Sequence, residues 1–215
     1  LIEKKNGARE QQANWWIDGF KQCLNQIDKN IIHSVDAVGV SGQQHGFVPI
    51  SKNGNVLAPV KLWCDTETTA ECDEIMDAVG GEEACVKIAG NPIAVGFTTS
   101  KIRWLKNNNP DAYAKMATIL LPHDYMNFYL TGNRTMEHGD ASGTGLLNVR
   151  TRSWSTPIIN ALDSERDLTP CLPNLIAADD IAGTLKSELA QEFGFKDHVI
   201  VSAGGGDNMM AAIGT

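Results

Sequence analysis

The sequence has no long apolar stretch and no cluster of basic residues. No run approaches the ~20 apolar residues that a membrane-spanning helix needs. Lys and Arg total 18 against 26 Asp and Glu, so the formal net charge is −8. An acidic chain disfavours nucleic acid, because phosphate binding depends largely on basic side chains. We therefore expect neither a nucleic acid nor a membrane as a partner.

Paired cysteine motifs are also lacking. The five cysteines are odd in number, and none forms a Cys-x-x-Cys pair: Cys23, Cys64, Cys72, Cys85 and Cys171. This spacing argues against a disulfide framework and against a zinc site, so we predict no metal ligands. We expect reduced thiols and a cytoplasmic location.

The 215 residues have an ordinary globular balance, with 42% hydrophobic and 20% charged residues. Short apolar runs alternate with segments whose apolar residues recur at helical spacing. We expect strands at 37–40, 47–50, 56–60, 117–121 and 199–201, and helices at 10–30, 66–79, 98–105, 123–130 and 184–193. This alternation predicts an α/β fold.

Single residues set several of these boundaries. Asn53-Gly54 predicts a hairpin turn. Thr66 is expected to cap the helix that Gly80-Gly81 ends. No strand is expected before the first helix, and the last residues resemble a helix just begun. We therefore expect a piece of a longer protein, incomplete at both ends.

The strongest chemical feature is Gly204-Gly205-Gly206-Asp207-Asn208, which follows the predicted strand at 199–201. Active sites of α/β sheets lie beyond the carboxyl ends of their strands. There Asp207 could accept the proton of a hydroxyl that attacks a phosphoryl group, while Asn208 holds a neighbouring hydroxyl. The alternative is an Asp207 that only caps the following helix, and the pattern by itself favours that cap.

A second polar segment, Ser41-Gly42-Gln43-Gln44-His45-Gly46, also follows a predicted strand. Gln and His side chains donate and accept hydrogen bonds, as recognition of a polyol requires. The alternative is a polar loop with a surface histidine. By itself the segment favours that alternative.

Two further segments allow a functional interpretation and a structural one. Trp63-Cys64-Asp65-Thr66 could offer a sugar an apolar face and a carboxylate, but a core Trp followed by a helix cap is favoured. The segment at 140–145 has the composition of a phosphate loop but lacks the Lys of a Walker motif. We interpret it as a structural turn.

Taken together and in order, these segments resemble the FGGY family of carbohydrate kinases. The similar segments cover nearly the whole chain: Ser41 to Gly46, Trp63-Cys64-Asp65, Phe97 to Leu105, Leu121 to Tyr125, Leu130-Thr131-Gly132, Asp140 to Thr144, and Gly204 to Asn208. The sequence departs from the family at Gln44, where Met is usual, and near Glu67, where Arg is usual. The resemblance favours Asp207 as a base over Asp207 as a cap.

The resemblance implies an α/β fold of the actin-like ATPase (ribonuclease H-like) type, with a mixed sheet flanked by helices. Residues 1–215 would form the N-terminal, sugar-binding domain without its first strands. The C-terminal domain, which holds most of the ATP site, would be absent from this chain.

The resemblance also implies an ATP-dependent sugar kinase whose substrate is D-xylulose and whose product is xylulose 5-phosphate. Asp207 would be the general base, and Gln44, His45, Asp207 and Asn208 would contact the sugar. ATP and Mg²⁺ would be bound mainly outside this chain, so the chain alone is expected to be inactive.

Several alternatives stay open. The substrate could be another sugar or polyol of the family: gluconate, ribulose, rhamnulose or glycerol. The chain could instead be a non-catalytic sugar-binding module. A dinucleotide-binding domain is disfavoured because no Gly-x-Gly-x-x-Gly opens a helix near the start of a βαβ unit. The oligomeric state is also open, with a homodimer as one candidate.

Overall fold

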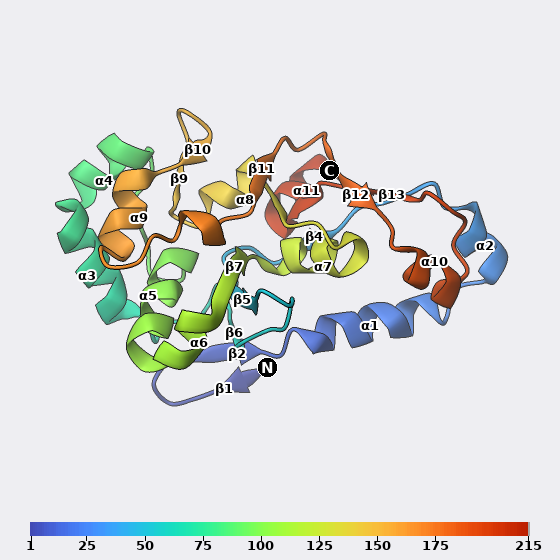
Figure 1. The fold of residues 1–215 in the computed structure, drawn as a ribbon, viewed down its shortest axis with the longest axis horizontal. Coiled ribbons are helices and arrows are strands. Elements are labelled where there is room, and N and C mark those ends of the chain that lie inside the picture. The colour runs from blue at the N-terminus through green and yellow to red at the C-terminus, as the bar shows by residue number, and fades with distance from the viewer. Residues whose placement is uncertain (215) are drawn as a thin grey trace.

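The structure is a computed structural model that describes residues 1–214 as a mixed α/β fold (Figure 1). Its strands are β1 (Ile2–Glu3), β2 (Arg9–Gln11), β3 (Ala37–Val38), β4 (Ser41–Gly42), β5 (Val48–Ser51), β6 (Val60–Lys61), β7 (Met116–Leu120), β8 (Thr135–Glu137), β9 (Leu147–Asn148), β10 (Ser153–Trp154), β11 (Asn174–Ile176), β12 (Ile181–Thr184), β13 (Ile200–Ser202) and β14 (Gly205–Gly206). Its helices are α1 (Asn14–Leu24), α2 (Lys29–Ser34), α3 (Thr69–Val79), α4 (Glu82–Ala89), α5 (Thr98–Asn108), α6 (Pro110–Lys115), α7 (Pro122–Thr131), α8 (His138–Ser142), α9 (Thr156–Leu162), the 3₁₀ turn Thr169–Cys171, α10 (Ser187–Phe193) and α11 (Asp207–Ile213).

Two short strand pairs join the beginning and the end of the chain. β13 lies parallel to β3 and antiparallel to β12, which makes a mixed sheet. Slightly further along both segments, β14 lies parallel to β4. Residues more than 160 positions apart in sequence are therefore neighbours in space at these pairs. The mixed sheet is confirmed, but the strands are short and divided among several small sheets.

Two of the hydrophobic cores are the ones that pack most of the helices. One packs the helices α3, α4, α5 and α9 against β7, through residues such as Ile75, Ile102 and Ile158. The other packs α10 and α7 against β13, through residues such as Phe193 and Val201. Figure 1 shows α8, α11, β4 and α7 near the middle of the molecule, with α3, α4 and α9 on one side and α10 on the other.

The N-terminal segment differs from its prediction. Two strands, β1 and β2, precede the first helix, and β2 pairs with both β1 and β6. The single helix predicted at 10–30 is two helices, because the chain turns after Leu24 and Asp28 caps a new helix at Lys29. Helical spacing of apolar residues persists across this break, so it could not reveal the break.

Capping predictions are confirmed at one end of α3 and wrong at the other. Gly80 ends α3 in a left-handed conformation with φ of 98°, as glycine allows. The N-cap is Thr68, two residues after the predicted Thr66, and the helix begins at Thr69. The backbone N–H of Thr66 instead donates to the carbonyl of Gly7.

The hairpin turn at Asn53-Gly54 is confirmed, with Gly54 at φ of 82° and its N–H donating to the carbonyl of Ser51. Of the predicted second strand at 56–60, Val56 makes a single bridge to Ile50, and Val60 begins β6, which pairs with β2. β5 pairs instead with β7, a largely buried apolar strand that lies much later in the sequence.

Helices α4, α6 and α9 were not predicted, and α8 lies where turns were expected. No helix within residues 1–214 is long and apolar enough to cross a membrane. The five cysteines are free thiols.

Candidate active site

The polar segments predicted from sequence meet at the carboxyl ends of β4 and β14. In this parallel pair Ser41 lies opposite Gly205, and Gly42 lies opposite Gly206. The residues that follow on each side are Gln43 to Gly46 and Asp207-Asn208. A Cβ built on Gly206 would lie 2.5 Å from Cγ of Gln44, so the two segments are in direct contact. The structure thus brings Gln44, His45, Asp207 and Asn208 to one edge.

His45 is held from two sides. Its Nδ1 lies 2.7 Å from the carbonyl oxygen of Gly143, and its ring stacks on Phe97 with centroids 4.8 Å apart. Burial lowers the pKa of the ring, and the Gly143 carbonyl opposes that shift. A carbonyl only accepts, so the proton of the neutral ring lies on Nδ1 and Nε2 remains as an acceptor. His45 is half-buried, and the alternative of a surface histidine is wrong.

The backbone of His45 is held as well. Its φ is 61°, a left-handed conformation that costs a non-glycine residue free energy. Nζ of Lys101 donates to the carbonyls of His45 and Gly96, both at 2.6 Å. Lys101 is fully buried, and burial lowers its pKa to about 7. This lysine fixes the conformation that places the imidazole.

Gln44 is anchored through Asp140. Its Nε2 lies 3.3 Å from Oδ1 of Asp140, and Oδ2 of Asp140 lies 2.6 Å from Nδ1 of His123. The structural turn predicted at 140–145 is therefore wrong in its first part. It begins within helix α8, which Glu137 caps by accepting from the backbone N–H groups of Gly139 and Asp140. The glycines of this segment lower helix propensity and concealed the helix.

Asp207 and Asn208 begin helix α11 and are exposed. The N-cap of α11 is Gly206, and within residues 1–214 Oδ1 of Asp207 accepts only the N–H of its neighbour Asn208, at 2.9 Å. The alternative of Asp207 as the helix cap is therefore wrong. Its carboxylate faces solvent next to the Gln44 segment.

Trp63 and Asp65 lie elsewhere and do different things. Trp63 is exposed, so the interpretation as a core Trp is wrong. Asp65 is fully buried and accepts from the backbone N–H groups of Arg9 and Glu67, at 2.8 Å and 3.1 Å. Glu67, near the place of the family's usual Arg, pairs with Lys61. Asp65 is therefore occupied by structural contacts.

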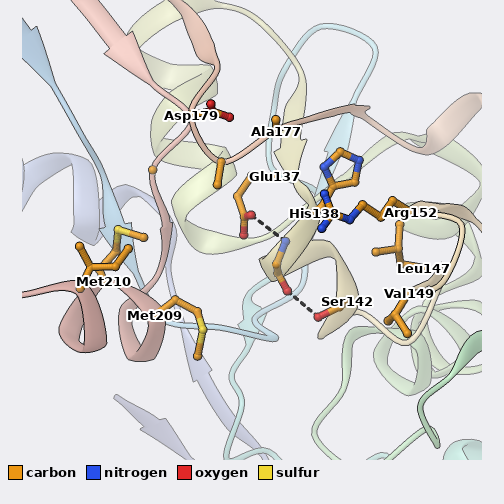
Figure 2. A pocket seen from close by; sticks show the side chains of 14 residues that line it. Glu137, His138, Ser142, Leu147, Val149, Arg152, Ala177, Asp179, Met209 and Met210 are labelled. Carbon is orange, nitrogen blue, oxygen red and sulfur yellow. Dashed lines mark hydrogen bonds between the residues drawn. The ribbon is translucent and has the colours of Figure 1, made fainter.

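A separate cleft of about 550 Å³ lies beside α11 (Figure 2). Met209 and Met210 form one side, and His138 and Arg152 lie on the other. Glu137 lines it too, but its carboxylate is occupied in capping α8. Asp207 and Asn208 do not line this cleft, but it adjoins the edge described above through Gly204 and Met209.

Sequence reasoning assigned no role to Lys101, His123 or Asp140. A signal existed for Lys101, which shares a helical face with the buried residues Thr98 and Leu105 at spacings of three and four. A lysine on such a face requires buried partners. No comparable signal marked Asp140, whose partners come from distant segments.

The strand pairing and the polar edge define an actin-like ATPase fold of the sugar-kinase type. The chain belongs to the FGGY family of carbohydrate kinases, because the N-terminal domain of that family matches residues 1–214.

Among curated relatives, the xylulose kinase of Haemophilus influenzae is 45% identical, covering 100% of this chain and 45% of the relative. The xylulose kinase of Bacillus subtilis is 34% identical, with 100% and 42% covered. This chain therefore spans less than half the length of the curated relatives it matches.

Solved structures agree on the fold. A crystal structure described as a xyloylose kinase from Brucella ovis matches with a TM-score of 0.87 at 30% identity, covering 96% of this chain and 42% of that one. The xylulose kinase of Rhodospirillum rubrum has a TM-score of 0.90 at 22% identity, covering 99% and 44%. At that identity the second match supports the fold alone.

Proposed function

We propose that residues 1–215 are the N-terminal, sugar-binding domain of an ATP-dependent xylulose kinase. Support comes from the family match and from relatives named as xylulose kinases. Because the chain spans less than half of those relatives, we place most of the ATP site outside it. The free cysteines support a reducing, cytoplasmic location.

In this proposal a hydroxyl oxygen of xylulose attacks the γ-phosphorus of ATP. The bond from that phosphorus to the bridging oxygen breaks, ADP leaves with the bonding electrons, and the hydroxyl proton passes to Asp207. The parallel pairing of β4 with β14 carries the proposal, because it sets Asp207 beside the polar Gln44-His45 segment. The exposed carboxylate is also open to an incoming hydroxyl.

The other proposed contacts hold the sugar. Nε2 of His45 accepts from one hydroxyl, and the amide of Asn208 pairs with another. Magnesium bound with ATP neutralises phosphate charge in such transfers. Within residues 1–214, no three His, Cys, Asp or Glu side chains are arranged to hold a metal ion. We propose that it is held, with ATP, mainly by parts of the protein outside this chain.

The test is an ADP-release assay of the full-length protein with xylulose, gluconate, ribulose, rhamnulose and glycerol. We expect the highest kcat/KM with xylulose. A much higher value with another sugar overturns the substrate. Sugar binding in calorimetry without ADP release from any of the five identifies a binding module instead.

The same assay is applied to residues 1–215 alone. We expect no xylulose-dependent ADP release from it, because phosphoryl transfer needs ATP and acceptor positioned together. Steady ADP release from the pure chain overturns the assignment of the ATP site to another part of the protein.

A further inference from the structure

The side chain of Gln44 bridges two loops of the candidate site. Its Cγ lies against the α-carbon of Gly206, where a Cβ would approach to 2.5 Å, and its Nε2 reaches Oδ1 of Asp140 at 3.3 Å. A methionine in this place, as is usual in the family, could make the first contact but has no group to donate to a carboxylate.

Asp140 is itself rigidly held. Its backbone N–H donates to Glu137, and its Oδ2 lies 2.6 Å from Nδ1 of His123. The side chains of both Asp140 and His123 are fully buried. Burial acts to lower the pKa of His123, but the charge of Asp124 and the hydrogen bond that the ring donates to Asp140 outweigh it and raise that pKa to about 9. The contact with His123 occupies Oδ2 of Asp140 and leaves Oδ1 as the acceptor that faces Gln44.

This arrangement decides which way the Gln44 amide is turned. Because a carboxylate accepts and does not donate, the NH₂ of Gln44 must face Asp140. The carbonyl oxygen Oε1 then lies on the opposite side of the amide. Within residues 1–214 it accepts no hydrogen bond, and the side chain is only half-buried. The amide therefore presents one free acceptor beside the turn that carries Asp207.

We propose that Oε1 of Gln44 accepts a hydrogen bond from one substrate hydroxyl and is a specificity-determining group, with Asp140 and His123 as the positioning residues that orient it. This inference rests on the proposed function, since it assumes that a polyhydroxylated sugar binds at this edge. It adds that Gln44 acts as an acceptor only and that its partner is a hydroxyl donor.

The experiment measures kcat/KM of the full-length protein with its best sugar and with each monodeoxy analogue of that sugar. For one analogue, the ratio of kcat/KM with the sugar to kcat/KM with the analogue should be about 3- to 10-fold larger in the wild type than in Gln44→Met. This is the effect expected from the loss of one neutral hydrogen bond. The change should lie mainly in KM. A Gln44→Met variant with the same preference for every hydroxyl as the wild type overturns the proposal.

Asp140→Asn tests the positioning role. An amide at residue 140 no longer forces the NH₂ of Gln44 toward it, so the preference for that hydroxyl should fall. In the Gln44→Met background the same change should leave the preference unaltered. An equal effect in both backgrounds overturns the role of Asp140, because a purely structural residue does not act through Gln44. If Asp140→Asn fails to fold in a thermal melt, Gln44→Met alone decides.

The two proposals fail in different ways. A wild type that prefers another sugar overturns xylulose as the substrate, and the analogues of that other sugar then test Gln44. A wild type that phosphorylates no sugar overturns both.

Discussion

The two sides of the candidate site are built differently. The side that follows β4 is anchored: Lys101 holds the carbonyl of His45, Gly143 and Phe97 hold its ring, and Asp140 holds Gln44. The side that follows β14 is open, because the Asp207 carboxylate is exposed and, among the described residues 1–214, accepts a hydrogen bond only from the next backbone N–H.

This difference suggests a division of roles, in which the anchored side recognises the sugar and the open side takes part in the reaction. Buried polar partners fix a side chain in advance, which reduces the entropy lost when a ligand binds. An exposed carboxylate keeps its capacity to take up a proton. Substitutions on the anchored side should therefore change sugar affinity and stability, whereas substitution of the Asp207 carboxylate on the open side should change turnover.

The largest effect is expected on the open side. In the full-length protein, Asp207→Asn should lower kcat by about 10²–10⁴-fold, the usual contribution of a general base. The thermal midpoint should not change, because the carboxylate has no buried partner. Steady-state kinetics and a thermal melt on the same sample measure both quantities.

Asp197→Asn is the matched control for charge, since Asp197 is also an exposed aspartate. It should leave kcat unchanged. Unchanged turnover in Asp207→Asn removes that residue from the proposed catalytic role, and a large loss of stability contradicts the description of its side as open.

The next effect is expected on the anchored side, at Lys101. Lys101→Met removes the buried donor that the carbonyls of His45 and Gly96 share, although the His45 carbonyl keeps the hydroxyl of Thr98 at 3.3 Å, and such a loss costs about 1–3 kcal/mol. Because His45 is then less firmly placed, the KM for sugar should rise roughly 10-fold. The kcat should change less than in Asp207→Asn.

Lys101 also predicts a pH dependence. Burial lowers its pKa in the folded protein to about 7, against 10.5 for an unperturbed lysine. Between these values the unfolded chain holds a proton that the folded chain has released, so the free energy of unfolding rises with pH. From pH 7 to 9 the stability of the wild type should gain roughly 2 kcal/mol relative to Lys101→Met.

Thermal midpoints of the full-length protein at several pH values measure this difference. Lys21→Met is the control. Lys21 is paired with Glu192 at the surface, and that pairing raises its pKa above 10.5, so it stays protonated in both states over the same range. The stability difference between the wild type and Lys21→Met should not change with pH. If the difference between the wild type and Lys101→Met does not change with pH either, the proposal that Lys101 is neutral in the folded protein is contradicted.

The same contrast explains how far the sequence predicts this protein. The open side could be predicted from the sequence because its residues are contiguous. A β-branched strand, three glycines and Asp207-Asn208 all lie within ten positions. The order of motifs also indicated the family and its fold. Local patterns such as Gly80 and Asn53-Gly54 predicted their turns because each depends on backbone conformation alone.

The contacts of the anchored side could not be predicted from the sequence in the same way. Gln44 and Asp140 are 96 positions apart, and His45 and Lys101 are 56 apart, so no local pattern links them. The pairing of β5 with β7 was missed for the same reason. Such contacts are set by tertiary packing, which overrides the propensities of single segments.

The smallest predicted effect lies where the two sides touch, at Gly206. Its φ of −62° suits any residue, so Gly206→Ala should not strain the backbone. The new methyl group would instead displace the Gln44 side chain, which lies 2.5 Å from its position. We expect a rise of about 3- to 10-fold in the KM for sugar, the size of one lost hydrogen bond, with little change in stability.

Gly205→Ala is the control one residue earlier, because its methyl group meets the flexible end of Met210 at 2.8 Å and not Gln44. Equal KM values in the two variants contradict the contact between the sides, whereas a rise confined to Gly206→Ala shows that the open side helps to place the anchored one.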